Sequence, residues 1–354
     1  MKRIIFLFTA SIFPILSIAE QQATVPASTC FLEQYSESVD CPSNSQVFIP
    51  MQHSMEMFEH DLACLKEAEQ MIEMSVCFMG GKILKQLLAV FNERLKARPE
   101  LEVYILGSPM LLTDHDYREI ALLRNNYPDR FHLQLTVSTP CESLEYRVTD
   151  NHIKCMIVDE KYFSIGGTNF DEALCTDGRF TPPPVEGASP ARSILPRGVR
   201  DYDIVGKGSL AKEIRAVFHK HYALWEHYEQ HSYADFINDP EYFADKSHYK
   251  PLDPSKPQAQ VVAIDHSAEQ IATSNAQLFV SGPHQAKANC IAQEYARLIK
   301  GAKQEIVIGN LYSNPSPPIC DALKQSVARG VALTYITNGR YSDSPFFCQF
   351  FFLR

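Results

Sequence analysis

Apolar and polar positions follow two periods along the chain from about Met55 onward. Apolar residues three or four positions apart predict amphipathic helices, and short apolar runs between them predict strands. The expected elements alternate as helix and strand at 55–70, 71–79, 82–99, 101–107, 114–128 and 131–137. This alternation predicts an α/β fold in which helices cover the faces of a sheet.

The pattern continues after a loop rich in proline and glycine at 181–198. DYDIVG (201–206) predicts a further strand, and 209–231 predicts a long amphipathic helix. Residues 238–260 contain four prolines and many polar residues, which is typical of a connection between domains.

A stretch of the first half is repeated in the second half. LKEAEQMIEMSVCF (65–78) matches LIKGAKQEIVIGNL (298–311) as a helix end followed by a strand, with Ala68 aligned to Ala302 at an offset of 234 residues. EVYILG (102–107) likewise matches LTYITNG (333–339). The repeat predicts a duplicated α/β architecture.

The same offset would place a counterpart of His152 near position 386, beyond Arg354. The second unit is therefore expected to be incomplete, and SPFFCQFFFLR shows neither the alternation nor the turn residues expected there. The expected divisions are a signal peptide (1–19), an N-terminal extension (20–54), a first domain (55–237), a linker and domain entry (238–288), a partial second domain (289–340) and an aberrant tail (341–354).

The net charge indicates which class of partner is disfavoured, and the N-terminal residues indicate the cellular compartment. The formal net charge is −9 with a pI near 5.7, which disfavours a nucleic-acid partner because neutralising phosphates needs a basic face. Lys2 and Arg3, the apolar run 4–18 and the small residues Ser17 and Ala19 predict an export signal cleaved before Glu20. The run is short for a membrane span, so we expect a periplasmic, envelope-associated or secreted protein.

Cysteine and histidine spacing gives no metal or cofactor prediction. All ten cysteines follow the expected cleavage point, with Cys30 and Cys41 a candidate local bridge and Cys77 and Cys155 expected to be buried thiols. No cysteine or histidine cluster has zinc-site spacing. His227 and His231 share a helix face, where a solvated polar surface is favoured over a metal site.

Residues 151–170 (NHIKCMIVDEKYFSIGGTNF) hold the strongest candidate chemistry. HIKCMIVD predicts a strand in which His152 and Lys154 share one face, while Ile153, Cys155 and Ile157 point into a core. Imidazole can act as a nucleophile or a general acid or base near neutral pH, and lysine is a compact charge suited to phosphate oxygens.

The second half of this stretch adds turn and anion-binding features. A turn at 159–161 leads to the strand YFSIG, and Gly166 and Gly167 permit a ligand to approach the backbone closely. Asn169 is expected to cap a helix whose exposed N–H groups favour an anion. Together the residues indicate a phosphate-ester site, although His-x-Lys alone would fit an incidental surface hairpin better.

The complete spacing, H-x-K, four residues, D, six residues and G-G-x-N, resembles the HKD signature of the phospholipase D superfamily. The matching residues are His152, Lys154, Asp159, Gly166, Gly167 and Asn169. The resemblance covers roughly 55–340 and is to a bacterial phospholipase D-like protein truncated before its second motif. It implies the mixed, duplicated sheet of that superfamily, with helices on its faces.

The resemblance also implies a two-step phosphodiester transfer without metal or cofactor. His152 is expected to attack phosphorus or to serve as acid and base. Lys154 and Asp159 are the further catalytic residues expected, with Asp159 tuning or bracing the site rather than touching the substrate. Lys154, Gly167, Thr168 and Asn169 are the expected phosphate ligands. Two HKD histidines are needed, and some members of the superfamily obtain the second by forming a homodimer.

Three hypotheses follow. The first is an exported phosphodiesterase acting on phospholipid headgroups at a membrane surface, completed by a second copy of the chain. The second keeps the chemistry but uses nucleic acid, which the 33 basic against 42 acidic residues disfavour. The third is an inactive, truncated paralogue that retains the fold and a binding role.

Overall fold

A computed structural model of the chain describes residues 37–41, 46–51, 53–108, 112–136, 151–177, 201–230, 252–257, 271–273, 276–280, 290–310 and 315–337. The expected signal peptide, Cys30, the loop at 181–198, His231 and the tail lie outside these residues. The chain divides into two compact units, one of Val39–Leu278 and one of Met1–Ser38 with Phe279–Arg354.

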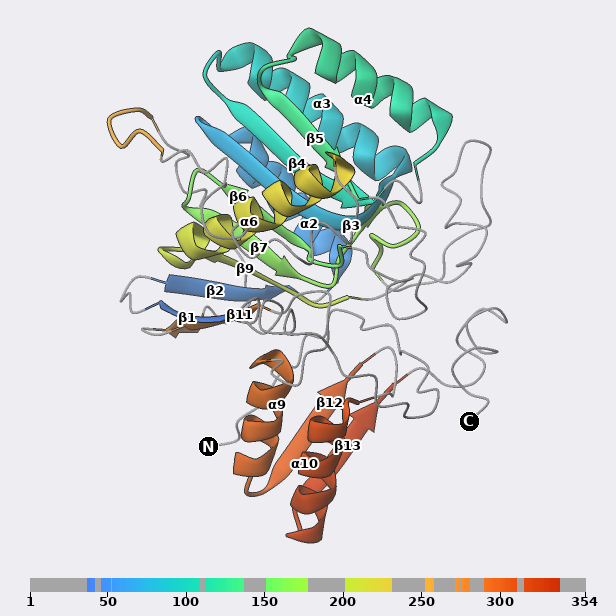
Figure 1. The fold of residues 1–354 in the computed structure, drawn as a ribbon, viewed down its shortest axis with the longest axis vertical. Coiled ribbons are helices and arrows are strands. Elements are labelled where there is room, and N and C mark those ends of the chain that lie inside the picture. The colour runs from blue at the N-terminus through green and yellow to red at the C-terminus, as the bar shows by residue number, and fades with distance from the viewer. Residues whose placement is uncertain are drawn as a thin grey trace. The chain divides into compact units, whose positions relative to one another are not determined.

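The larger unit contains a nine-stranded mixed sheet (Figure 1). Eight strands lie in the order β10-β2-β9-β7-β6-β3-β4-β5, and β8 pairs with β3 beside this path. They are β2 (Gln46–Met51), β3 (Met71–Gly80), β4 (Glu102–Ser108), β5 (Phe131–Leu135), β6 (Cys155–Val158), β7 (Tyr162–Gly166), β8 (Phe170–Asp171), β9 (Asp203–Lys207) and β10 (Ile271–Thr273). The run β3-β4-β5 is parallel, whereas β6, β7, β9, β2 and β10 continue the sheet by antiparallel pairing. The predicted mixed sheet with flanking helices is confirmed.

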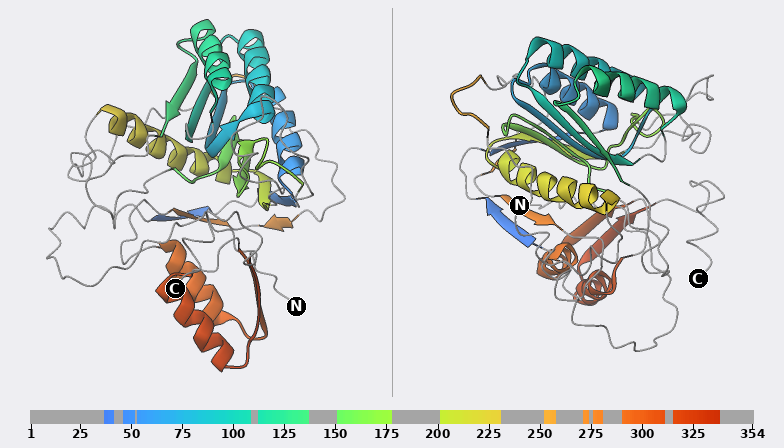
Figure 2. Two further views of the ribbon diagram at one scale, coloured as in Figure 1. Left: turned by 90° about the vertical axis from the view of Figure 1, so that its right-hand side faces the viewer. Right: turned by 45° about the horizontal axis from the view of Figure 1, so that its top comes forward.

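Helices cover both faces of this sheet (Figure 2). α2 (Ser54–Lys66), α3 (Gly81–Ala97) and α4 (Asp114–Asn126) pack on one face, and α6 (Leu210–Gln230) packs on the other. Alternation along β3 divides its side chains between the two cores, with Ile72 and Met74 facing the first and Met71 facing α6. A strand buried on both faces appears in sequence as a largely apolar run, as β3 does apart from Glu73 and Ser75.

A buried ionic network fixes α6 to the sheet. Arg215 and His219, both from α6, contact Glu73 of β3, and all three side chains are fully buried. Arg215 also pairs with Glu160 in the turn after β6. Because removing one partner would leave a buried charge unpaired, this network fixes how the helix lies against the strands that carry the candidate site.

Two predicted boundaries are wrong. The strand of HIKCMIVD begins only at Cys155, so His152 and Lys154 precede it. α2 ends at Lys66 rather than near residue 70, because the N–H groups of Glu69 and Gln70 donate to the carboxylate of Asp159 and not to helix carbonyls.

Five strands were not predicted from the sequence: β1 (Glu37–Cys41), β2, β8, β10 and β11 (Ala276–Val280). β2 lies within the expected N-terminal extension, yet it pairs with β9 and β10 in the main sheet. β2 includes Pro50, opposite Ile204 of β9, although proline is uncommon in an internal strand. β1 pairs with β11 in a separate two-stranded sheet.

The C-terminal unit contains α9 (Cys290–Gly301), β12 (Glu305–Gly309), α10 (Pro317–Ala328) and β13 (Ala332–Ile336). β12 and β13 pair in parallel, and Ile299, Ile306, Ile308 and Leu323 form a small core of their own. These four elements lie where the repeated sequence predicts a helix, a strand, a helix and a strand.

Candidate functional site

The motif residues surround the hairpin formed by β6 and β7. His152 and Lys154 lie in the segment before β6, Asp159 begins the turn after it, and Gly167, Thr168 and Asn169 follow β7. Because the hairpin is antiparallel, the start of β6 and the end of β7 are neighbours: Cys155 pairs with Ile165. Pairing therefore brings His152 and Lys154 to the same end of the hairpin as the two glycines.

His152 and Lys154 are in direct contact. The ammonium Nζ of Lys154 lies 3.0 Å from Nδ1 and 3.4 Å from Nε2 of the imidazole, and it donates to the carbonyl of His152 at 3.0 Å. Lys154 is buried and His152 is partly exposed. Burial, and secondly the charge of Lys154, lower the pKa of His152 to about 3, so the imidazole is neutral at physiological pH. A neutral imidazole is the nucleophilic form.

Gly166 and Gly167 are required by two aspartates that were not recognised from the sequence. A Cβ atom on Gly166 would lie 2.7 Å from the Cα of Asp203, and one on Gly167 would lie 2.6 Å from Oδ1 of Asp201. Both aspartates belong to DYDIVG, whose apolar residues indicated only a strand. The glycines therefore allow the chain to pass directly against this acidic strand.

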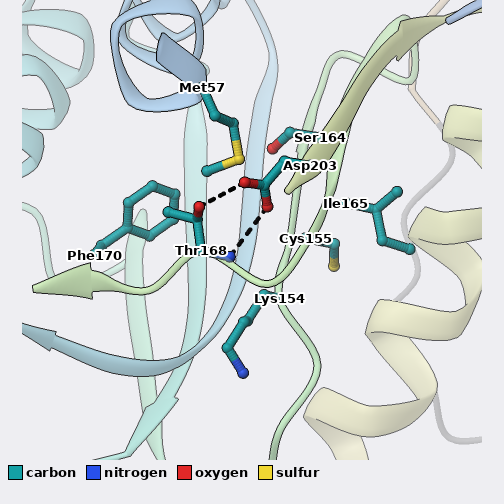
Figure 3. A pocket seen from close by; sticks show the side chains of 9 residues that line it. Met57, Lys154, Cys155, Ser164, Ile165, Thr168, Phe170 and Asp203 are labelled. Atoms are coloured by element: carbon teal, nitrogen blue, oxygen red, sulfur yellow. Dashed lines mark hydrogen bonds between the residues drawn. The ribbon is translucent and has the colours of Figure 1, made fainter. Parts of the chain in front are cut away.

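Thr168 is bonded to Asp203 (Figure 3). Its hydroxyl donates to Oδ2 at 2.6 Å and its N–H donates to Oδ1 at 3.0 Å, and both residues are buried. Burial raises the pKa of Asp203 to about 7. The expected phosphate contact from Thr168 would therefore require its hydroxyl to leave Asp203. Gly167, also an expected ligand, donates its N–H to the carbonyl of Tyr202 at 3.4 Å.

A small pocket lies between Lys154 and α2 (Figure 3). It is lined by Met57, Lys154, Cys155, Ser164, Ile165, Gly166, Thr168, Phe170 and Asp203. In Figure 3 the Lys154 ammonium points away from the Thr168–Asp203 pair. Asp201 adds a second carboxyl near Lys154: burial raises its pKa, and the lysine charge opposes that rise.

Asn169 does not cap a helix, so this prediction is wrong. It is followed by β8 and a turn rather than by a helix, because Phe170 and Asp171 pair with Met79 and Gly80 of β3. The buried side chain of Asn169 accepts from the N–H of Phe78 at 3.0 Å through Oδ1. The residue is thus held against the end of β3, and the expected helix N-terminus for an anion is not formed there.

Asp159 lies at the other end of β6. It begins a tight turn in which Asp159 and Glu160 both have positive φ, 51° and 52°. Its carboxylate accepts from the N–H groups of Glu69 at 2.9 Å, Gln70 at 2.9 Å and Met71 at 2.8 Å. It lies five positions along a mostly extended chain from Lys154, about 16 Å away. The geometry is that of a brace for the start of β3.

The remaining sequence predictions concern cysteines, metal ligands and a membrane span. Cys77 and Cys155 are buried thiols, as predicted. Within the described ranges no group of three His, Cys, Asp or Glu side chains is arranged to hold a metal. In the same part of the chain no helix is both long and apolar enough to span a bilayer. The side chain of His227 and all of His231 lie outside the described residues.

Comparison with known proteins supports the fold. The chain is similar to the phosphatidylserine synthase of Haemophilus influenzae Rd KW20, with a TM-score of 0.54 and 13% sequence identity over 90% of this chain and 66% of that chain. It thus spans slightly less than two thirds of the synthase's length. Its sheet and helices match this phospholipase D-like fold, as the sequence predicted.

Other similarities are weaker. NucT from Helicobacter pylori matches with a TM-score of 0.31 and 8% identity over 52% of this chain and 95% of that chain. Polyphosphate kinase from Porphyromonas gingivalis matches with a TM-score of 0.42 and 8% identity over 89% of this chain and 40% of that chain. No protein-family model and no curated protein matches the chain.

Proposed function

We propose that the chain is a phospholipase D-like phosphodiesterase that forms a covalent phosphohistidine at His152. The observation that carries the proposal is the contact of a neutral imidazole with the Lys154 ammonium at 3.0 Å, in the spacing of the HKD signature. A nucleophile is thereby held beside a fixed positive charge, and the phosphoryl oxygens of a diester would lie against that charge.

In the proposed first step, an unprotonated imidazole nitrogen attacks phosphorus and the bond from phosphorus to the leaving alcohol breaks. The alcohol takes a proton from a general acid, which a second histidine would supply. In the second step, water deprotonated by that histidine attacks phosphorus, the bond from phosphorus to nitrogen breaks, and a phosphomonoester leaves. Lys154 stabilises the charge on the equatorial oxygens in both steps.

We propose that a second copy of the chain supplies the second histidine, because two identical motifs related by a two-fold axis would complete the site. Mixing tests this partnership: a ninefold excess of His152→Ala chains should lower the activity per wild-type chain about tenfold, because most wild-type chains would pair with a variant. Undiminished activity in the mixture would rule out a shared site.

Export and a phospholipid substrate remain parts of the proposal. The N-terminal leader supports export, and the similar fold of a phosphatidylserine synthase supports a lipid diester. Edman sequencing of the protein recovered from outside the cytoplasm should begin at Glu20. Turnover of DNA in preference to phospholipid vesicles would instead favour the endonuclease alternative.

The deciding experiment is hydrolysis of a chromogenic phosphodiester by wild type, His152→Ala and a matched control, His115→Ala. His115 is an exposed histidine at the start of α4, so its loss should leave turnover unchanged. Wild-type activity lost only in His152→Ala, together with acid-labile phosphate on the wild-type protein, supports the proposal. A folded wild-type sample with no turnover would instead favour the inactive paralogue.

A further inference from the structure

His152 lies where the backbone ladder has already ended. The pairing of β3 with β6 runs from Ile72 opposite Val158 to Ser75 opposite Cys155. The segment of Asn151, His152 and Ile153 continues past this last pair without strand hydrogen bonds. Since the position of a nucleophile to within about 1 Å affects rate strongly, some other contact has to fix this segment.

Two buried polar side chains make that contact. The Ser75 hydroxyl donates to the carbonyl of Ile153 at 3.0 Å and accepts from Nδ2 of Asn151 at 2.8 Å. Oδ1 of Asn151 accepts from the N–H of Ile153 at 3.3 Å. Ser75 is 2% exposed and Asn151 is 4% exposed, so water cannot easily replace these bonds. The donors and acceptors match: one hydroxyl proton, one amide donor and one amide acceptor are each used.

The same end of β3 also holds Asn169. The register of β3 against β4 is irregular between Val76 and Phe78, and the N–H of Phe78 donates to Asn169. One short stretch of strand therefore bonds both neighbours of His152, through Ser75, and Asn169, through Phe78. An irregularity of this kind redirects backbone groups beside a site.

We propose that Ser75 and Asn151 are positioning residues that hold the His152 backbone so that its imidazole stays against the Lys154 ammonium. Any effect of these two residues on the reaction rate rests on the proposed function. Their effect on the position and titration of the His152 imidazole does not. The two effects can therefore be tested separately.

The first test is NMR titration of ¹³C,¹⁵N-histidine in wild type, Ser75→Ala and Ser75→Thr, with the His152 signal assigned from His152→Ala. Ser75→Ala should free the segment into water and raise the titration midpoint of His152 by one pH unit or more. Ser75→Thr keeps the hydroxyl and should restore the wild-type midpoint. Ser326→Ala is the matched control, because Ser326 is a buried serine that donates to the carbonyl of Ile299 at 2.9 Å in the C-terminal unit.

The second test is steady-state kinetics on a chromogenic diester. Ser75→Ala should lower kcat about 10- to 100-fold with little change in KM, because the nucleophile and not the phosphate ligand is displaced. Asn151→Ala should likewise lower kcat with little change in KM. The kcat of the double variant should be only slightly lower than that of either single variant, since both substitutions break one network.

The outcomes separate the two proposals. An unchanged His152 titration in both Ser75→Ala and Asn151→Ala would overturn the positioning role, whatever the activity. The His152 titration could shift in the variants while the wild-type protein shows no turnover. That result would support the positioning role and reject the phosphodiesterase. Should Ser75→Ala fail to fold, the titration of Asn151→Ala decides.

Discussion

The chain builds one order of elements twice, as α2–β3–α3–β4 and as α9–β12–α10–β13. Local details repeat as well. The N–H of Glu102 donates to the carbonyl of Gln70 at 3.0 Å, and the N–H of Ala332 donates to that of Gln304 at 2.9 Å. Each is the first bond between the two parallel strands, so similar sequence produces the same local start of the sheet.

The two regions differ in what lies beside the first strand. β3 pairs with β4 on one side and with β6 on the other, and its residues are almost all buried. β12 pairs with β13 alone among the described strands, and β13 is largely exposed, with Ile336 63% exposed. At the repeat offset, Ser75 of β3 corresponds to Gly309 of β12, which has no side chain to position anything. The repeated unit is thus a scaffold, and the candidate chemistry depends on the antiparallel strands added to it.

The sharpest test of this difference between the β3 region and the β12 region is the loss of turnover on substitution in each. His152→Ala should lower kcat roughly 1,000-fold or more, a barrier increase of about 4 kcal/mol, because the nucleophile is lost. Its melting temperature should stay close to that of wild type, since the segment is fixed by neighbouring groups. Stopped assays with phosphohistidine trapping measure the loss of kcat, and a thermal unfolding scan measures the melting temperature. A comparable loss on substituting a charged residue of α10, such as Asp321→Asn, would break the contrast.

The free energy of unfolding should depend on pH in wild type because of Asp203, and this dependence should be absent from Asp203→Asn. Its raised pKa, about 7 when folded against 3.8 unfolded, means that the native state holds the proton more tightly. Its stabilising contribution is complete below pH 4 and is lost as pH rises through 7, on the order of 4 kcal/mol. Asp203→Asn should remove this dependence, which urea unfolding at pH 4, 6 and 8 measures as the difference between wild type and variant. A pH-independent difference would mean that Asp203 is ionised throughout.

Asp159 provides the third test, because its carboxylate accepts three N–H groups at and just before the start of β3. Asp159→Asn keeps the turn, since asparagine tolerates positive φ, but its amide can no longer accept all three N–H groups. We expect a loss of about 3 kcal/mol in the free energy of unfolding. Exposed Asp129→Asn is the charge-matched control and should change little. Equal effects of the two substitutions in urea would remove the bracing role.

Most of the scaffold was predictable because its helices and strands bury one periodic face or a continuous apolar run. Residues 71–79, 82–99 and 162–166 were placed within about two residues of the observed elements. The misses have physical causes. The helix expected to end at residue 70 stops early because a carboxylate 89 residues away takes the N–H of Gln70, a contact that no local pattern reveals.

The sequence predicted that His152 and Lys154 lie together, but it did not predict the long-range contacts of the hairpin that carries them. The spacing of His152 and Lys154 indicated proximity, which the structure shows. By contrast, Asn169 was expected at a helix start because asparagine is a common cap, and long-range pairing with β3 made a strand instead. Ser75, Asp201 and Asp203 lie in apolar stretches that predicted only strands, so their polar roles become visible only once the sheet brings them to the hairpin.

Two strand-end glycines give the smallest but most direct comparison. Gly166→Ala places a methyl group against the backbone of Asp203 and should cost about 1–3 kcal/mol of unfolding free energy, because backbone cannot move aside cheaply. Gly309→Ala meets no atom within 4 Å and should stabilise its unit by about 0.5 kcal/mol, through reduced freedom of the unfolded chain. Urea unfolding of both variants followed by hydrogen exchange assigns each effect to its unit. Opposite signs would show that glycine is required at the hairpin and only tolerated at β12, whereas a loss of stability in both variants would mean that Gly309 also lies in a close approach.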